Sequence, residues 1–155
     1  MLEEFSIGSG GFAVAFSDPK YNQSSGWLEN YLVTLQGPAL SAIVRVENHP
    51  AGSDPSSFFG KLAESWQGWK GDKKWGSMEG ELDLGARADS LGHVTIEVRV
   101  RPDAYPARWS ASLSVEVDAG ELERTHRLCK RFFARPEAQT APEGYELPPV
   151  SRTPS

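Results

Sequence analysis

Carboxylates on one predicted strand are the residues of this sequence best placed to do chemistry. Glu79, Glu81 and Asp83 alternate along the chain, and Glu97 lies on the strand that we expect to pair with theirs. Two carboxyl groups held close together can act as general acid and general base, as in glycoside hydrolases. The Asp83–Glu97 end of this row is therefore the candidate for acid–base chemistry.

Arginines on the same predicted face offer a simpler interpretation. In the register that we predict for the two strands, Arg99 lies opposite Glu81 and Arg101 lies opposite Glu79. Opposite charges across paired strands are typical of a solvated sheet face, where each ion pair contributes little. We therefore predict no catalytic residue and treat the four acidic side chains as part of a binding surface.

A histidine and a cysteine lie three residues apart on a predicted helix. His126 and Cys129 could share a metal ion, but a structural zinc site needs four ligands, and His49 and His93 are isolated in the sequence. A thiol on the apolar stripe of a helix has a raised pKa and is inert as a nucleophile. We predict no metal site and no cofactor.

A glycine-rich stretch near the start superficially resembles a phosphate-binding loop. Gly8-Ser9-Gly10-Gly11 lacks the lysine, the following Ser or Thr and the helix that such a loop needs. Turns are the commoner use of glycine, because this residue adopts positive φ without steric cost. We predict a hairpin turn between two short strands, one with Phe5 and Ile7 and the other over residues 12–16.

Three tryptophans gather within residues 66–75. Trp66 continues the apolar stripe of the preceding helix, so we expect its ring to lie under the sheet. Trp69 and Trp75 flank a loop rich in glycine and lysine. They either pack between the helix and the sheet as core residues or contact a partner, as loop aromatics often do. The binding candidates are Trp69, Trp75, Glu79, Glu81, Asp83 and Glu97.

Hydrophobic periodicity predicts an α+β fold, a twisted antiparallel sheet of six or seven strands with two packed helices. After the first hairpin and a loop over residues 18–26, strands are expected at 27–36 and 40–47. Asp54 and Pro55 favour a helix start, and Phe58, Phe59, Leu62 and Ala63 follow at helical spacing. Further strands are expected at 77–86, 93–101 and 109–117, and a last helix follows Asp118, which forms a capping box with Glu121.

One hairpin is predicted down to its register. Leu84 is expected opposite Ile96, and Leu82 opposite Val98, with the turn in residues 89–92. The same register brings opposite charges together on the other face, so two independent patterns favour it.

Length and charge bound the class of protein. The 155 residues suit one domain over residues 1–135, followed by a proline-rich tail over residues 136–155 that we expect to be disordered. A single cysteine, no signal peptide and no apolar run approaching the roughly 20 residues of a membrane helix favour the cytoplasm. The net charge of −5 argues against nucleic-acid binding and suits a basic protein partner.

Landmark residues over roughly residues 5–135 resemble an uncharacterised domain family frequent in actinobacteria. The landmarks are Phe58-Phe59-x-x-Leu62, Trp66-x-Gly68-Trp69, Leu82-x-Leu84, Gly92-His93-Val94, Trp109 at the start of the last strand, and Glu121-Leu122. In layout the chain is also similar to immunity proteins of bacterial wall-associated-protein toxin systems. That resemblance implies a non-enzymatic protein that binds and blocks a toxin, with no catalytic residue to carry over.

Two functions therefore remain open. The first is a cytosolic binding protein of the immunity type, with an acidic surface that steers a basic partner. The alternative is a small-molecule-binding or enzymatic domain with a pocket between the curved sheet and the helices, which would show convergent polar groups around a cavity.

Overall fold

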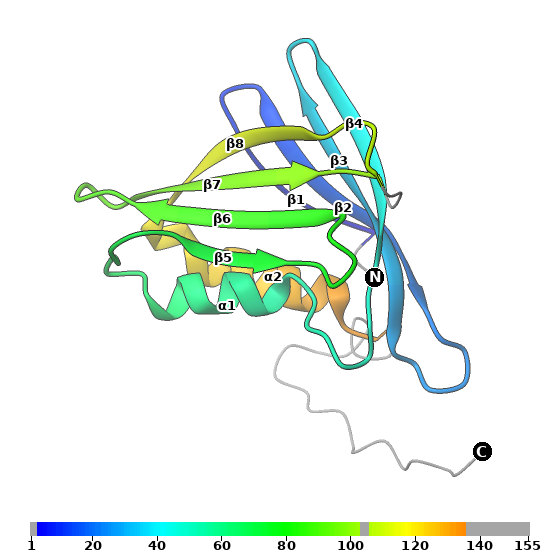
Figure 1. Cartoon of the computed structure of the whole chain (residues 1–155). Helices are drawn as coiled ribbons and strands as arrows, with labels where there is room; N and C mark the ends of the chain where they lie inside the picture. The colour runs from blue at the N-terminus through cyan, green and yellow to red at the C-terminus, as the bar shows by residue number, and fades with distance from the viewer. Residues whose placement is uncertain (1–2, 103–105, 136–155) are drawn as a thin grey trace.

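The computed structural model describes residues 3–102 and 106–135, which form two antiparallel four-stranded sheets and two helices (Figure 1). The first sheet has the order β1 (Glu4–Ser9), β2 (Phe12–Tyr21), β3 (Leu28–Gly37) and β4 (Leu40–Glu47). The second has the order β5 (Lys73–Gly76), β6 (Leu82–Ala88), β7 (His93–Val100) and β8 (Ala111–Asp118). The helices are α1 (Ser56–Glu64) and α2 (Leu122–Phe133), and a short 3₁₀ turn, η1 (Ala119–Glu121), precedes α2.

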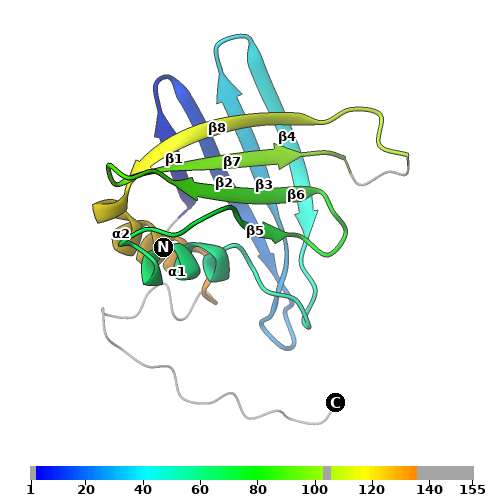
Figure 2. The ribbon, with the colours of Figure 1, turned by 60° about the vertical axis from the view of Figure 1, so that its left-hand side comes forward.

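The α+β class and the two helices are confirmed, but the single sheet of six or seven strands is wrong. The strands of the second sheet run across those of the first, and α1 and α2 lie side by side at one end of the pair (Figures 1 and 2). The chain leaves β4 through a loop and α1 before it forms β5, so the ladder of hydrogen bonds stops at β4. Periodicity predicts strands, but it does not say which strands share a sheet.

The core lies between the two inner sheet faces and the helices. Its buried side chains are almost all apolar. Aromatic rings connect each helix to the first sheet. Tyr31 of β3 packs edge-on against Phe133 of α2, with 4.9 Å between ring centroids, and Phe5 of β1 packs edge-on against Phe59 of α1, with 5.6 Å between centroids. Such edge-to-face pairs each contribute about 0.5–1.5 kcal/mol beyond the burial of their area. Both helices are thus anchored on the first sheet.

The first hairpin is confirmed, whereas the predicted loop over residues 18–26 begins too early. Gly10 and Gly11 have φ of +59° and +84° at the turn, as a tight hairpin requires. Strand β2 continues through Asp18 to Tyr21 with a bulge, and the Asp18 carboxylate pairs with Arg45 at 2.7 Å. Polar residues extend this strand because their side chains face solvent and find charged partners there.

Only part of the predicted strand over residues 77–86 is a strand, and a strand that was not predicted precedes it. Residues 73–76 form β5, a turn with Gly80 at φ +81° follows, and β6 begins only at Leu82. Met78, in that turn, is 63% exposed as a result. Glycine in the middle of an alternating pattern marks a turn here, because its positive φ reverses the chain.

The faces of the β6–β7 hairpin are confirmed and its register is wrong by two residues. Leu84 pairs with Val98, and Asp83 with Arg99, while Leu82, Leu84, Val94, Ile96 and Val98 are all buried. A shift of two residues keeps every side chain on its face, so alternation could not detect it. In the observed turn, the Asp89 carboxylate accepts the backbone N–H groups of Leu91 and His93, at 2.8 and 2.9 Å.

Helix α1 begins as predicted but ends before Trp66. Asp54 accepts the backbone N–H of Ser56 at 2.7 Å, and the apolar stripe of the helix is buried. The helix ends at Glu64, so Trp66 leaves the stripe and is 57% exposed, contrary to the prediction that it lies under the sheet. At the other helix, the Asp118 side chain makes no capping hydrogen bond, and the η1 turn opens α2 instead.

Strand β8 begins at Ala111, so Trp109 precedes it and does not open it. The predicted tail over residues 136–155 lies outside the described residues. Neither described helix is long and apolar enough to cross a membrane.

Candidate functional site: a charged groove on the second sheet

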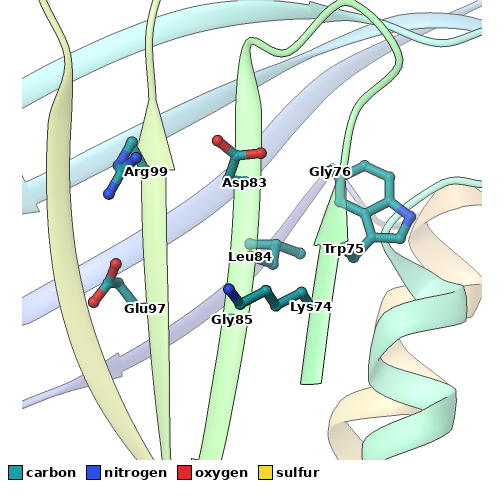
Figure 3. Close-up of a pocket in the computed structure, with 8 residues that line it drawn as sticks. All are labelled: Lys74, Trp75, Gly76, Asp83, Leu84, Gly85, Glu97 and Arg99. Carbon is teal, nitrogen blue, oxygen red and sulfur yellow. The ribbon is translucent and has the colours of Figure 1, made fainter. Parts of the chain in front are cut away.

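A shallow groove of about 440 Å³ crosses the outer face of the second sheet (Figure 3). It lies over three neighbouring strands, β5, β6 and β7, whose outward-facing positions carry polar or small residues. Gly76 and Gly85 have no side chains to fill the space, so backbone forms part of the floor. The groove is therefore a hollow in a rigid sheet.

Four charged side chains surround this floor. Asp83 of β6 lies directly opposite Arg99 of β7, while Gly85 lies between Lys74 on one side and Glu97 on the other. Within the described ranges, none of these four charged groups makes a hydrogen bond or an ion pair with another residue. Two positive and two negative groups thus present an alternating, locally neutral pattern to solvent.

The arrangement suits binding better than catalysis. Catalytic carboxylates are usually held in enclosed, partly apolar surroundings that set one of them apart as an acid. Asp83 and Glu97 instead stand on the exposed face of an open sheet. Their geometry offers charged contacts to a molecule that covers the groove.

The tryptophan at the groove points away from it. Trp75 of β5 lines the edge, but its ring turns toward the α1 side (Figure 3), where its indole N–H donates to Ser53 Oγ at 3.0 Å. Trp69 is also partly buried against the core and donates to the Ala86 carbonyl at 3.3 Å. The Lys73 ammonium lies 5.5 Å from the centre of the Trp69 ring, a distance at which cation–π attraction acts.

The four acidic residues that were predicted to bind, Glu79, Glu81, Asp83 and Glu97, lie in three different environments. Asp83 and Glu97 reach the groove, whereas Glu79 is exposed and pairs with His49 Nε2 at 2.8 Å. Glu81 is only 1% exposed, so the prediction that it is a surface residue is wrong. The predicted pairs with Arg99 and Arg101 do not form. The two-residue change of register places Arg99 opposite Asp83, and it brings the Arg101 backbone N–H, rather than its guanidinium, to the Glu81 carbonyl at 2.9 Å.

The buried carboxylate of Glu81 joins the two sheets. One oxygen accepts the backbone N–H of Glu47 on β4 at 2.9 Å, and the other accepts the Ser77 hydroxyl at 2.9 Å. Ser77 Oγ in turn accepts the N–H of Leu82, which starts β6. The turn around Gly80 folds Glu81 inward, a step that alternation along the sequence did not reveal.

Sequence reasoning missed Lys74, because β5 was not recognised, and it missed a second hollow. That hollow, of about 500 Å³, lies between the end of α1, the β6–β7 turn and η1, with Trp66 and the 79% exposed Leu91 on its walls. The predicted turn over residues 89–92 could have indicated one wall of this hollow. The other wall could not be predicted, because the position of Trp66 depends on where α1 ends. Exposed apolar side chains are thus found here rather than at Trp69 and Trp75.

The titratable groups away from the groove have structural roles. Burial raises the pKa of the Cys129 thiol well above its usual value. The Asp89 carboxylate, which hydrogen-bonds the ring of His93 at 3.1 Å, raises the pKa of that imidazole. No three His, Cys, Asp or Glu side chains gather into a metal-binding group in the parts of the chain that the structure describes.

The fold is that of a small α+β protein with two crossed sheets. The chain belongs to a family of unknown function (DUF6228), whose model matches residues 6–136. No curated protein matches its sequence. Among solved structures, the chain is similar to the plant transcriptional regulator PBF-2, with a TM-score of 0.44, 9% identity, and coverage of 80% of this chain and 76% of that chain.

Proposed function

We propose that this protein is a non-enzymatic binding protein that recognises another protein through the groove of the second sheet. The observation that carries the proposal is the set of four charged side chains, Lys74, Asp83, Glu97 and Arg99, that surround a glycine floor with no partner among the described residues. They stand on three hydrogen-bonded strands, so a complementary surface can bind without first ordering the backbone that carries them.

Charge explains how such a partner would be selected. Alternating charges on a rigid face reject surfaces that place like charges opposite them, which provides specificity. The net charge of −5 attracts a basic partner over a longer range. Long-range attraction and local charge pattern therefore act at different stages of the same encounter.

The most concrete form of the proposal is an immunity-type inhibitor in the bacterial cytoplasm that blocks a basic toxin. The acidic net charge and the resemblance in layout to immunity proteins support it. In this form, Asp83 and Glu97 would contact basic groups of the toxin, and Lys74 and Arg99 would contact its acidic groups. Trp69 and Trp75 act behind the groove by fixing the position of β5.

The alternative, a small-molecule or enzymatic site between sheet and helices, has less support. The space between the sheets and helices is occupied by apolar side chains, and Glu81, the buried polar residue among those described, is engaged by Glu47 and Ser77. A pocket site would instead need convergent polar groups around a cavity in that layer.

A capture experiment with matched charge variants tests the proposal. The tagged protein is used to capture partners from the native host, in parallel with Asp83→Lys/Glu97→Lys and with the control Glu64→Lys/Glu123→Lys. Both pairs change the net charge equally, but the control residues lie on the exposed sides of the helices. We expect one protein to be retained by the wild type and the control and lost by the groove variant.

Equal capture by all three proteins would refute the groove as the binding site. The captured protein then tests the immunity form directly: expressed alone it should stop bacterial growth, and co-expression of the wild type but not of the groove variant should restore growth. A captured protein that is harmless when expressed alone would leave a binding function but exclude toxin inhibition.

A further inference from the structure

Strand β4 is an edge strand that is less protected than the other sheet edges: its outward backbone is bonded at Glu47, by Glu81, and Pro102 and Trp109 lie beside it. Exposed edges invite pairing with another chain, and proteins protect them by shortness, lysine or a covering element. The β5 edge has four residues with two lysines, and the β1 and β8 edges pack against each other, where Ser9 Oγ accepts the Glu116 N–H at 2.8 Å. β4 has eight residues and contains neither lysine nor proline.

The register shows which backbone groups of β4 face outward. Its residues alternate between pairing with β3 and pointing away, and the Glu47 N–H, which is bonded by Glu81, belongs to the outward set. Ser41, Ile43 and Arg45 follow at the same period, so their N–H and C=O groups also point away from β3. Among the described residues, no hydrogen bond from outside the sheet reaches these three backbone positions.

The surface beside this edge is largely apolar, although the exposed side chain of Glu47 also lines it. Ile43 is 58% exposed, Trp109 is 44% exposed, and together with Pro102 they line a hollow of about 310 Å³. Arg45 is held on its own sheet by Asp18 at 2.7 Å and Asn30 at 2.6 Å, so its charge is compensated. An extended chain laid along β4 would satisfy backbone groups and cover apolar side chains at once.

We propose that a second copy of this chain occupies the β4 edge, so that two β4 strands pair antiparallel about a twofold axis at Ile43 and join two sheets into one of eight strands. This proposal is independent of the charged groove, which lies on the other sheet. A twofold interface must be self-complementary, because each copy offers the same patch.

The sequence of β4 meets that requirement when the twofold axis passes through Ile43. With Ile43 opposite Ile43 of the second copy, Ser41 lies opposite Arg45 in both directions, so apolar meets apolar and no like charges face each other. Moving each strand by two residues in one direction would place Arg45 opposite Arg45. Moving it the other way would leave Ile43 opposite the turn residue Ala39.

The same register also gives the hollow beside Trp109 an occupant. Counting along the paired strands, Ala39 of each copy lies opposite Glu47 of the other. The exposed turn of Pro38 and Ala39 would then meet the hollow lined by Pro102 and Trp109. Apolar surface at the tip of the hairpin and apolar surface beside the strand are covered together.

The mass of the protein in solution tests the proposal. Sedimentation equilibrium of the full chain should give a species of twice 17.0 kDa that dissociates on dilution. Ile43→Lys would place two ammonium groups together on the axis and should raise the dissociation constant by about thirtyfold or more, the effect of a hot-spot residue. Its melting temperature should be unchanged apart from the loss of dimer, because residue 43 is exposed.

Leu91→Lys is the matched control, since Leu91 is still more exposed and lies on the second hollow, away from β4. It should leave the dimer intact. A wild type that is monomeric at every soluble concentration, or an Ile43→Lys variant as dimeric as the wild type, would overturn the proposal. A dimer broken by Leu91→Lys and not by Ile43→Lys would assign the interface to the second hollow and overturn it too.

Disulfide cross-linking tests the register itself. Directly opposite residues of a hydrogen-bonded antiparallel pair have Cα atoms about 5.5 Å apart, within the range that a disulfide spans. Ile43→Cys should therefore give a covalent dimer under mild oxidation, while Leu91→Cys should not. The native Cys129 is buried and does not interfere. A dimer in which Ile43→Cys fails to cross-link would refute the pairing.

Discussion

Removal of the Glu81 carboxylate should destabilise this protein far more than removal of a surface carboxylate. The side chain is buried between the sheets and accepts hydrogen bonds from the Glu47 N–H and the Ser77 hydroxyl. In Glu81→Ala both donors lose a charged acceptor. For the Glu47 N–H, which points away from β3, this acceptor lies outside the hydrogen bonds of its own sheet. The link between β4 and the start of β6 is lost with them.

The magnitude follows from the two contacts. A hydrogen bond to a charged group contributes about 1.5–3 kcal/mol, and loss of two is offset in part because the buried carboxylate no longer has to be desolvated. We expect the free energy of unfolding to fall by about 3–5 kcal/mol. Glu81→Gln should lose less, because its carbonyl oxygen can still accept the Glu47 N–H while its amide donates to Ser77 Oγ.

Equilibrium unfolding in urea measures these differences, with Glu79→Ala as the control. Glu79 is exposed and its pair with His49 is a surface contact, so its removal should cost under about 1 kcal/mol. If Glu81→Ala unfolds at the same urea concentration as Glu79→Ala, the bridge between the sheets contributes nothing and the reasoning fails. Equal losses in Glu81→Ala and Glu81→Gln would show that charge, rather than the hydrogen bonds, is what matters.

Three further predictions follow from burial and pKa. Ile96→Ala should lower the free energy of unfolding by about 2–5 kcal/mol in the urea assay, because Ile96 is fully buried, and a loss below about 1 kcal/mol would contradict that burial. Trp66→Ala should change it by less than about 1 kcal/mol, because the ring is exposed, and a large loss would mean that it packs inside. In an NMR titration, the pKa of His93 should lie above 6.5 and fall in Asp89→Asn. The folded pKa of His93 is raised, so the stabilisation from this pair should be lost as the pH rises through the pKa of His93. The folded pKa of Asp89 is lowered, so the stabilisation should also be lost as the pH falls through the pKa of Asp89.

Local patterns predicted the elements and most of the buried faces. Alternation placed Leu82 and Ile96 inside and Arg99 outside, and the spacing of Phe58 and Leu62 identified α1. These predictions succeed because the period of a strand or helix is a local property, visible within a few residues.

Properties that depend on distant residues could not be predicted in this way. The division into two sheets depends on how the chain crosses over after β4, and the burial of Glu81 depends on a donor, Glu47, on another sheet. For the groove, Asp83 and Glu97 both line it, but they are not opposite each other as the predicted register had it, and Lys74 enters only when β5 pairs with β6. A four-residue strand with one apolar side chain, Trp75, shows too little alternation to be recognised.

The position of α2 determines when this chain can fold during its synthesis. Phe133 completes the aromatic cluster around Tyr31, and the Tyr21 hydroxyl donates to the Ala134 carbonyl at 2.8 Å. The first sheet is made early, yet the side chains that close its inner face come from the last described helix. Nascent chains that end before Leu122 should therefore remain sensitive to protease and dependent on chaperones, because long-range contacts cannot stabilise a sheet before their partners are synthesised.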